Sequence, residues 1–276
     1  MSDVAVITGT THGIGRVTSH VLAQSGFTVV MLCRDVDAAR ALQKEMVAAT
    51  PSASVHVVRC DLASLASVRE CAASVRNSVG GLKLLINNAG IVSTRHRMSV
   101  DGFELTFATN HLGPFLLTRL LQDRLDPNGG RIINVASQVH FRGRLNLEAI
   151  RDPNARYSGT AAYAQSKLAN VLHTFALARR LAGSTVTVNC LHPGVVATNL
   201  LPRWLRVIKP LLSRVIFDEQ RGARTTLHLA LSSDVAGISG RYFDEHSIAR
   251  PAAPLADDLE LQDLLWRRSS DWTRLA

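Results

Sequence analysis

Five short motifs carry the residues of this chain whose types and spacing suggest chemistry. They are residues 8–15 (Thr-Gly-Thr-Thr-His-Gly-Ile-Gly), residues 87–90 (Asn-Asn-Ala-Gly), Asn110, Ser137 and residues 163–167 (Tyr-Ala-Gln-Ser-Lys). Each motif alone has an ordinary explanation, such as a tight turn or a surface serine. Together they offer a glycine-rich cradle for phosphate, a proton donor, a neighbouring cation and a hydroxyl for a carbonyl oxygen. That set predicts hydride transfer to or from a nicotinamide cofactor.

The glycine-rich motif lies between an apolar, strand-like run and the first helix-like segment. Gly9, Gly13 and Gly15 follow the spacing G-x-x-x-G-x-G. Glycine permits a tight turn there and lets backbone N–H groups approach a pyrophosphate, whose charge the helix N-terminus favours. We therefore predict a dinucleotide-binding turn. The other residues expected to contact the cofactor here are Thr11, His12, Ile14 and Arg16.

The end of the second apolar run indicates which dinucleotide is bound. Sites that prefer NAD(H) carry an Asp or Glu about 20 residues after the glycine motif, which bonds the ribose 2′-hydroxyl. Here the run ends Cys33-Arg34-Asp35. Arg34 offers a planar fork for a 2′-phosphate, and Arg16 is placed to approach the same phosphate. We therefore predict NADP(H) as the cofactor, while Asp35 keeps NAD(H) as the alternative.

Three further stretches supply the remaining predicted cofactor contacts. Asp61 and Leu62 follow the third strand-like run and are expected beside the adenine. The motif at 87–90 ends the fourth run with small and amide residues that suit backbone contact with the cofactor. A segment after the sixth run is expected close to the nicotinamide. The residues from these last two stretches are Asn88, Ala89 and Gly90, and Pro193, Gly194, Val196 and Thr198.

Tyr163 and Lys167 are four residues apart in a helix-like segment, so they share a face of the helix. A free tyrosine has a pKa of ~10, poorly matched to proton transfer near neutrality. A neighbouring ammonium, together with an oxidised nicotinamide ring, is expected to lower that pKa. Ser137 ends the fifth strand-like run, where it can hydrogen-bond a substrate oxygen, and Asn110 is expected to hold a water. Alone, the Tyr/Lys pair would also fit an ordinary amphipathic helix.

These motifs need a scaffold in which strands and helices alternate. Apolar runs suited to buried parallel strands occupy residues 4–8, 28–33, 55–59, 84–88, 131–137 and 185–192, with a short seventh at 240–243. Segments with helical spacing occupy residues 14–24, 36–49, 65–79, 101–125 and 163–182. This alternation predicts an α/β fold: a Rossmann-type, doubly wound parallel sheet of about seven strands with helices on both faces. Residues 1–276 are expected to form a single domain.

Composition narrows the functional class. The 276 residues carry a net charge of +9, but the basic residues are spread along the chain, so we expect no specific nucleic-acid binding. No apolar stretch approaches the ~20 residues of a transmembrane helix. The first residues leave no room for a signal peptide, and a cytoplasmic protein is expected. The four cysteines are scattered, which favours buried thiols and predicts neither a disulfide nor a metal site.

Residues 195–219 depart from the alternation. Apolar residues recur there at three- and four-residue steps, on helical pieces that Pro202 and Pro210 would interrupt. We predict a lid over the reacting carbon, and hence a bulky, lipophilic alcohol, aldehyde or ketone as the small-molecule substrate. Basic residues of the same segment would face solvent or an anionic membrane surface. Peripheral membrane contact is therefore compatible with the sequence, as is a homodimer or homotetramer.

With these motifs the chain resembles the short-chain dehydrogenase/reductase family, and most closely its retinol-dehydrogenase-like branch. The resemblance extends over nearly the whole chain and rests on residues 8–15, 33–35, 87–90, 109–113, 163–170, 192–194 and 240–243. It implies an NADP(H)-dependent alcohol dehydrogenase or carbonyl reductase.

The resemblance also implies a role for each candidate catalytic residue. Tyr163 would be the acid/base and Ser137 would orient the carbonyl. Lys167 would tune the tyrosine and bind the ribose, and Asn110 would hold a water. Arg34 is similar to the NADP-type arginine of the branch. Two alternatives remain open: a non-catalytic NADP(H)-binding regulatory or peripheral membrane protein, and an enzyme similar to the light-dependent protochlorophyllide reductases.

Overall fold

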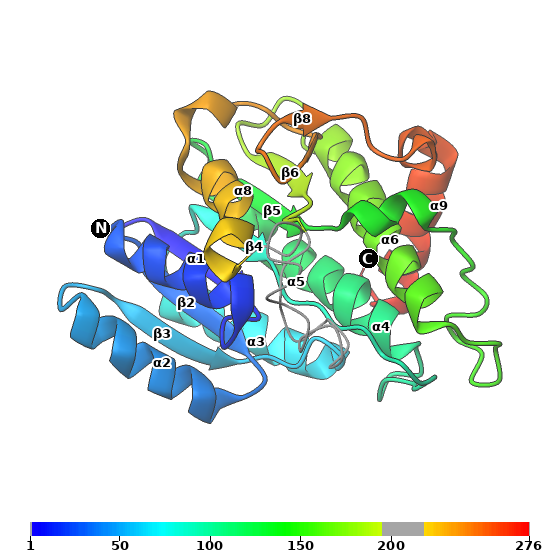
Figure 1. Cartoon of the computed structure of the whole chain (residues 1–276), viewed down its shortest axis with the longest axis horizontal. Coiled ribbons are helices and arrows are strands. Elements are labelled where there is room, and N and C mark those ends of the chain that lie inside the picture. Colours follow the sequence, from blue (N-terminus) through cyan, green and yellow to red (C-terminus); the bar gives the residue numbers. More distant parts are fainter. Residues whose placement is uncertain (1, 195–217, 276) are drawn as a thin grey trace.

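A single twisted sheet forms the centre of the molecule (Figure 1). The computed structural model describes residues 2–194 and 218–275. The strands lie in the order β3-β2-β1-β4-β5-β6-β7-β8, and all neighbours are parallel except β7 and β8. Their bounds are β1 (Val4–Thr8), β2 (Thr28–Cys33), β3 (Val55–Arg59), β4 (Leu84–Asn87), β5 (Arg131–Val135), β6 (Thr187–Leu191), β7 (Tyr242–Phe243) and β8 (Ala249–Arg250).

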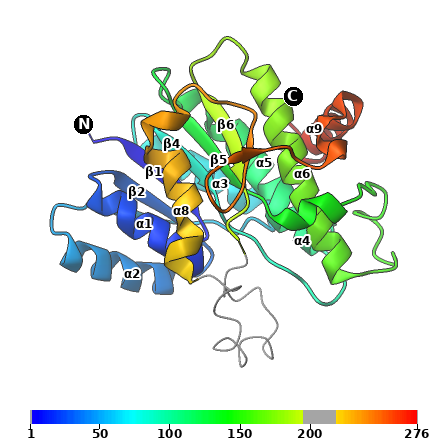
Figure 2. The same cartoon turned by 45° about the horizontal axis from the view of Figure 1, so that its top comes forward.

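Helices cover both faces of the sheet, as Figures 1 and 2 show. The core on one face is shared by α1 (Gly13–Gln24), α2 (Val36–Ala49) and α8 (Glu219–Leu231). The core on the other face is shared by α3 (Leu65–Ser78), α5 (Gly113–Leu121) and α6 (Gly159–Arg180). The last helix, α9 (Leu259–Trp272), packs against α6. The predicted fold class, a doubly wound α/β sheet, is confirmed.

The strand sequences explain why both faces must be covered. In β1, Ala5 and Ile7 point into the core shared with α1, α2 and α8. Val6, between them, points into the opposite core. Successive side chains of a strand alternate between faces, so a run that is apolar at every position needs helices on both sides.

Most of the predicted elements match the structure. The strands expected at 4–8, 28–33 and 55–59 are confirmed at both ends, and the next three are shorter than expected. The seventh, expected at 240–243, forms as Tyr242–Phe243. The eighth strand was missed, because it has only two residues and pairs antiparallel with β7. Helices α8 and α9 also lie outside the predicted set.

The helix predicted at 101–125 begins later than expected, and its geometry changes along its length. It consists of α4 (Leu105–Phe107), a π-helical turn (Ala108–Leu112), α5 and a short 3-10 turn (Gln122–Arg124), which follow one another without a gap. The segment also packs closely against a neighbouring loop. A side chain at Gly113 would bring Cβ to 2.3 Å from the carbonyl oxygen of Leu62, so the chain passes close to the loop after β3 there. The π turn carries the candidate residue Asn110 at this point.

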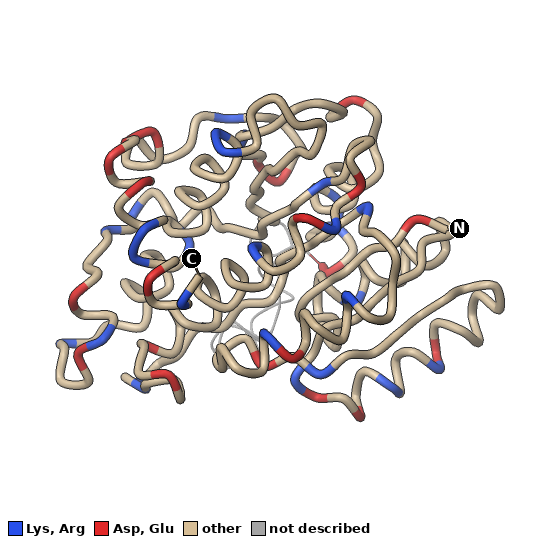
Figure 3. Tube along the Cα trace, turned by 180° about the vertical axis from the view of Figure 1, so that it is seen from behind, with Lys and Arg blue, Asp and Glu red and all other residues tan. Residues whose placement is uncertain are grey.

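Basic and acidic residues are interspersed along the chain when it is seen from behind (Figure 3). Several of the arginines and lysines form ion pairs, including Arg76 with Asp123 at 2.6 Å and Lys83 with Asp126 at 2.9 Å. The positive charge of these side chains is therefore offset by an acidic neighbour, while the net charge of the chain stays +9. Among the residues that the structure describes, no helix is both long and apolar enough to cross a bilayer.

Candidate active site

The predicted site residues come together at the carboxyl edge of the sheet. The loops after β1, β4, β5 and β6 carry the glycine motif, residues 88–90, Ser137 and residues 193–194, respectively. Parallel strands end at the same edge, so residues far apart in sequence become neighbours there. Strand order reverses between β1 and β4, and ligands of doubly wound sheets bind at such a switch point.

The glycine turn is held by the loop after β4. The Asn88 side-chain amide donates to the carbonyl oxygens of Thr8 and Gly9, at 2.9 and 3.1 Å. The Thr8 hydroxyl in turn accepts the backbone N–H groups of Asn88 and Ala89, each at 3.0 Å. A Cβ on Gly15 would lie 2.2 Å from the Gly9 carbonyl oxygen. These contacts leave no room for larger side chains and hold the turn in one shape.

This turn fits the pyrophosphate of a dinucleotide. Gly9 and Gly13 adopt φ of 70° and 61°, in the left-handed region that favours glycine. His12 is the N-cap of α1, and within the described residues its side chain makes no capping hydrogen bond. The first turn of α1 carries no acidic residue, so its N–H groups and positive helix end are available to an anion. Thr11 and His12 are joined at 2.8 Å through Thr11 Oγ1 and His12 Nδ1.

The two arginines predicted to bind a 2′-phosphate differ in their surroundings. Arg34 is exposed directly after β2, and no ion pair to it is found in residues 2–194 and 218–275. Arg16 instead pairs with Glu45 of α2, at 2.7 and 2.9 Å. The Asp35 carboxylate is the N-cap of α2 and accepts the Ala38 N–H at 3.0 Å. The structure therefore leaves Arg34 available to a phosphate and gives Arg16 and Asp35 other partners.

The remaining predicted cofactor contacts lie in three places along the same edge. Asp61 accepts the Ala63 N–H at 3.0 Å, and Leu62 is buried beside α5. Pro193 and Gly194 directly follow β6, and Gly194 has φ of 82°. Val196 and Thr198 lie outside the described residues, as does most of the predicted lid at 195–219.

Tyr163, Lys167 and Ser137 converge beside the glycine turn. Tyr163 and Lys167 lie on α6, whose N-cap Ser158 accepts the Ala161 N–H; α6 therefore begins before Tyr163, at Gly159. The Lys167 ammonium is 5.6 Å from the centre of the Tyr163 ring and donates to the Val135 carbonyl oxygen at 2.7 Å. Ser137 lies two residues beyond the end of β5, as the N-cap of a 3-10 helix (Gln138–Arg142).

The predicted lowering of the Tyr163 pKa, by Lys167 together with an oxidised nicotinamide ring, stays a prediction, and the groups of the protein itself act in the opposite direction. Burial raises the pKa of Tyr163 to about 12, and its hydrogen bond with Ser137 lowers that pKa only in part. Burial also lowers the pKa of Lys167 to about 8. Desolvation disfavours the charged form of both groups, so the phenol keeps its proton and the ammonium is weakened. At neutral pH the pair is a protonated tyrosine beside a lysine that is still mostly charged.

Asn110 joins three parts of the site. Its Oδ1 accepts the Ile91 N–H at 2.8 Å. Its amide donates to the Ile91 carbonyl oxygen at 2.9 Å and to the Ser166 hydroxyl at 3.0 Å. A Cβ on Gly90 would lie 3.5 Å from both Asn110 Oδ1 and Lys167 Nζ. Both N–H donors of the Asn110 amide are therefore used within the protein. One lone pair of Asn110 Oδ1 remains to accept a hydrogen bond from the water that Asn110 is predicted to hold.

Other residues that hold the site were missed in the sequence. A buried amide pair lies behind it, where Asn87 donates to Asn134 Oδ1 at 2.8 Å and to Thr118 Oγ1 at 2.9 Å. A polar residue such as Asn134 inside an apolar strand was the available signal, since buried amides need partners. The Val135 carbonyl oxygen, which accepts the hydrogen bond from Lys167, could not be predicted from the sequence, because every residue has a backbone carbonyl.

The state of the four cysteines agrees with the sequence prediction. All four cysteines, Cys33, Cys60, Cys71 and Cys190, are free and buried, which confirms the expected thiols. The part of the chain that the structure describes contains no group of three or more His, Cys, Asp or Glu side chains arranged to hold a metal ion.

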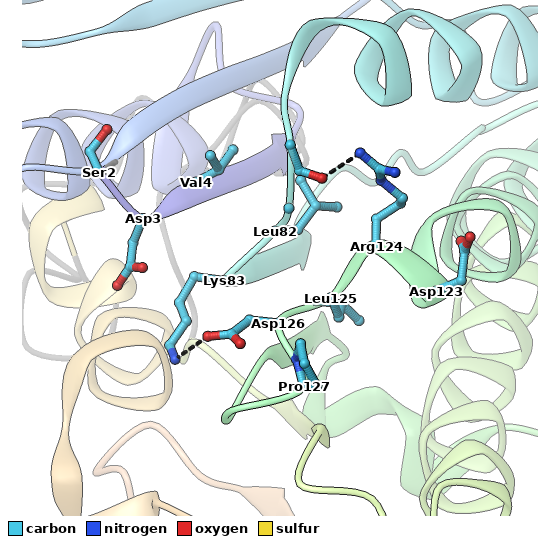
Figure 4. Close-up of a pocket in the computed structure, with 12 residues that line it drawn as sticks. Ser2, Asp3, Val4, Leu82, Lys83, Asp123, Arg124, Leu125, Asp126 and Pro127 are labelled. Carbon is cyan, nitrogen blue, oxygen red and sulfur yellow. Dashed lines mark hydrogen bonds and ion pairs between the residues drawn. The ribbon is translucent and has the colours of Figure 1, made fainter.

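A hollow of about 390 Å³ lies away from these residues, at the amino ends of the strands (Figure 4). Val4 begins β1 and Lys83 directly precedes β4. Lys83 points toward Asp126, its ion-pair partner, and Arg124 donates to the Gly80 carbonyl oxygen. Lys83, Asp126 and Arg124 thus have partners within the protein, and the carboxyl edge is the better candidate for chemistry.

Similarity to known proteins supports the family that the sequence motifs suggest. A family model described as short chain dehydrogenase matches residues 3–206. Retinol dehydrogenase 13 of Homo sapiens is 38% identical over 274 residues, which cover 96% of this chain and 82% of that protein. A crystal structure of a Mycobacterium paratuberculosis protein is similar, with a TM-score of 0.80 and 35% identity, covering 99% and 93% of the two chains. A metagenomic blue fluorescent protein in complex with NADPH has a TM-score of 0.72 and 27% identity, covering 88% and 95%.

These matches extend over nearly the whole chain, and they agree with the sheet order and with the motifs at its carboxyl edge. The chain belongs to the short-chain dehydrogenase/reductase family of oxidoreductases, in its retinol-dehydrogenase-like branch.

Proposed function

We propose that this protein is an NADP(H)-dependent alcohol dehydrogenase or carbonyl reductase. The observation that carries the proposal is the convergence of Tyr163, Lys167 and Ser137 next to the glycine turn. The Lys167 ammonium lies 5.6 Å from the Tyr163 ring, and the Ser137 side chain hydrogen-bonds Tyr163. A proton donor, a cation and a second hydroxyl therefore face the edge where the dinucleotide turn lies.

The residues that would hold the cofactor fall into two groups. The turn at 9–15 and the N-terminus of α1 would bind the pyrophosphate, and Arg34 would bind the 2′-phosphate. Asn88, Ala89 and Gly90 would line the cofactor from the next loop. When bound, the nicotinamide supplies or accepts the hydride. The NADPH complex of the metagenomic relative supports NADP(H) over NAD(H). Arg34 supports it as well, since it is exposed and has no ion-pair partner within residues 2–194 and 218–275.

The protein's own residues would manage the proton and the oxygen. The Ser137 hydroxyl donates a hydrogen bond to the substrate oxygen and holds it near the Tyr163 hydroxyl. Tyr163 gives its proton to that oxygen in reduction and takes it back in oxidation. The charge on Lys167 stabilises the tyrosinate that forms. Burial raises the pKa of Tyr163, so the phenol carries the proton that reduction requires.

A lipophilic carbonyl or alcohol is the proposed substrate class. The apolar sequence pattern of the lid at 195–219 supports it, as do relatives named retinol dehydrogenases. Phe141, in the 3-10 helix that follows Ser137, leaves 49% of its surface exposed, so this helix offers an apolar side chain at the surface. We also propose that residues 1–276 act as one cytoplasmic domain, as a homodimer or homotetramer.

The test is NADPH consumption with aldehydes and ketones graded in size and polarity. We expect catalytic efficiency to rise with apolar length, and Trp204→Ala to flatten that rise. Tyr163→Phe keeps the ring and removes the acidic proton, so turnover should fall at least 100-fold (roughly the worth of one acid/base group) while NADPH still binds. Substantial turnover by the Phe variant would remove Tyr163 from the acid/base role. A screen in which small polar carbonyls are the best substrates would refute the lipophilic class alone.

Peripheral contact with a membrane is a second proposed function, and it is suggested by the basic residues in the sequence of the lid. They are Arg203, Arg206, Lys209 and Arg214. Sedimentation with anionic and with neutral liposomes tests it. Binding to anionic liposomes only, lost at high salt, is expected for a basic surface contact, and no sedimentation with either would exclude it.

A further inference from the structure

A buried histidine next to the candidate site has no part in the proposed proton transfer. His140 follows Ser137 by three residues, in the 3-10 helix Gln138–Arg142, and is 0% exposed. Its Nδ1 lies 2.7 Å from the Ser137 carbonyl oxygen. Its Nε2 lies 3.1 Å from the backbone nitrogen of Ala253. The ring thus connects the turn that carries Ser137 to Ala253, which lies 113 residues after His140 in the chain.

The two contacts specify one state of the ring. The Ala253 N–H can only donate, so Nε2 must be the unprotonated acceptor. The Ser137 carbonyl can only accept, so Nδ1 must carry the proton and donate it. His140 is therefore neutral, with its proton on Nδ1. Burial lowers its pKa and so favours the same neutral state.

His140 is part of the serine turn, and its side chain links that turn to Ala253 outside it. Local bonds also shape it, from the His140 N–H to the Ser137 carbonyl at 3.1 Å and from the Val139 N–H to Ser137 Oγ at 3.4 Å. The other side of the turn presses on α6, since a Cβ on Gly143 would lie 2.7 Å from the Ala164 carbonyl oxygen. Ala164 directly follows Tyr163. The Ser137 turn therefore lies between α6, which carries the proton donor Tyr163, and the segment at Ala253.

The segment at Ala253 belongs to the C-terminal part of the molecule. It lies between β8 and a 3-10 helix (Pro254–Asp257) that leads to α9. Tyr242 of β7 packs on the His140 ring, with centroids 4.7 Å apart. A displacement of this C-terminal part would act on His140 at both places, and through it on Ser137.

We propose that His140 is a positioning residue that fixes Ser137 by tying its carbonyl to Ala253. The C-terminal segment thereby sets the place of the hydroxyl that orients the substrate oxygen. This inference rests on the proposed function, in which Ser137 performs that orientation. His140 itself touches neither substrate nor cofactor.

The first test measures the ring state directly and needs no turnover. Long-range ¹H–¹⁵N NMR of histidine-labelled protein distinguishes the two neutral tautomers, and loss of the signal in His140→Phe assigns it. We expect the proton on Nδ1 across the neutral range. A proton on Nε2, or a ring that exchanges freely between tautomers, would contradict the link to Ala253.

The second test is a double-mutant cycle with Ser137→Ala. His140→Phe keeps a ring and loses both hydrogen bonds. It should lower kcat by roughly tenfold to a hundredfold, as expected when a catalytic group is misplaced, with NADPH affinity unchanged. In the Ser137→Ala background the same substitution should cost little further activity, because the group it positions is gone. Equal fold losses in both backgrounds would overturn the proposal.

A matched variant separates positioning from general damage. His140→Asn can still donate to the Ser137 carbonyl but has no group that reaches Ala253, so kcat should lie between wild type and His140→Phe. If His140→Phe fails to fold, the Asn variant in both backgrounds completes the cycle. If the wild type reduces no carbonyl at all, the proposed function fails, while the tautomer measurement still decides whether His140 bridges Ser137 and Ala253.

Discussion

Selection of the phosphorylated cofactor should depend on Arg34 far more than on Arg16. Arg34 is exposed at the end of β2 and, in the described structure, has no acidic partner to give up. Arg16 is already paired with Glu45. A phosphate can therefore recruit Arg34 directly, whereas Arg16 must first leave its carboxylate. Arg34→Ala should weaken NADPH binding and leave NADH binding almost unchanged.

The expected magnitudes follow from these contacts. A charge-assisted bidentate contact contributes about 1.5–3 kcal/mol, so Arg34→Ala should cost roughly tenfold or more in NADPH affinity. The Arg16–Glu45 pair is 45% and 52% exposed, and such surface pairs are worth about 0.2–1 kcal/mol. Glu45→Gln frees Arg16 and should strengthen NADPH binding by at most about fivefold, the conversion of that energy at room temperature.

Calorimetric or fluorescence titration of both cofactors, on wild type and both variants, provides the assay. Salt should weaken NADPH binding more than NADH binding, because the extra contact is ionic. Equal losses for NADPH and NADH in Arg34→Ala would refute Arg34 as the selector. Weaker NADPH binding by Glu45→Gln would refute the competition between the carboxylate and the phosphate for Arg16.

The other predictions concern pH and the glycine turn. The pKa of Lys167 is lowered to about 8 and that of Tyr163 is raised to about 12, so kcat/KM for reduction should fall as pH rises through about 8, when the ammonium loses its proton. Lys167→Arg should move that fall to higher pH, and an unchanged profile would assign it to another group. Gly15→Ala, with Cβ 2.2 Å from a backbone oxygen, should lower the free energy of unfolding by about 1–3 kcal/mol and weaken NADPH binding. Gly80→Ala, with no atom within 4 Å, is the control and should change neither in thermal unfolding with and without NADPH.

Local signals account for the parts of the fold that were predicted well. The first two strands are short runs that end just before Gly9 and Arg34, and their bounds match because strands buried on both faces are apolar at nearly every position. The third, at the edge of the sheet, was predicted from the valines at 55, 57 and 58 although His56 and Arg59 are exposed. The glycine motif could also be identified in the sequence. Gly9 approaches Ala89 so closely that no side chain fits there, and this constraint appears in the sequence as a glycine.

Contacts between distant segments account for the parts that were missed. The predicted helix at 101–125 has π geometry just before Gly113, which packs against the Leu62 backbone, and its apolar periodicity carries no trace of that contact. Helix α9 was also missed. Its Trp266 ring lies 5.0 and 4.1 Å from the guanidinium groups of Arg119 in α5 and Arg180 in α6, contacts that the sequence of α9 does not record.

For the site, residue types and spacing determined the chemistry available: a phosphate turn, a tyrosine four residues before a lysine, and a serine after a strand. Only the tertiary structure decided how these groups are charged and held. Burial raises the pKa of Tyr163, an effect that its spacing to Lys167 does not reveal. The reason is that desolvation depends on every segment packed around a group, whereas spacing along a helix reports only its neighbours in the chain.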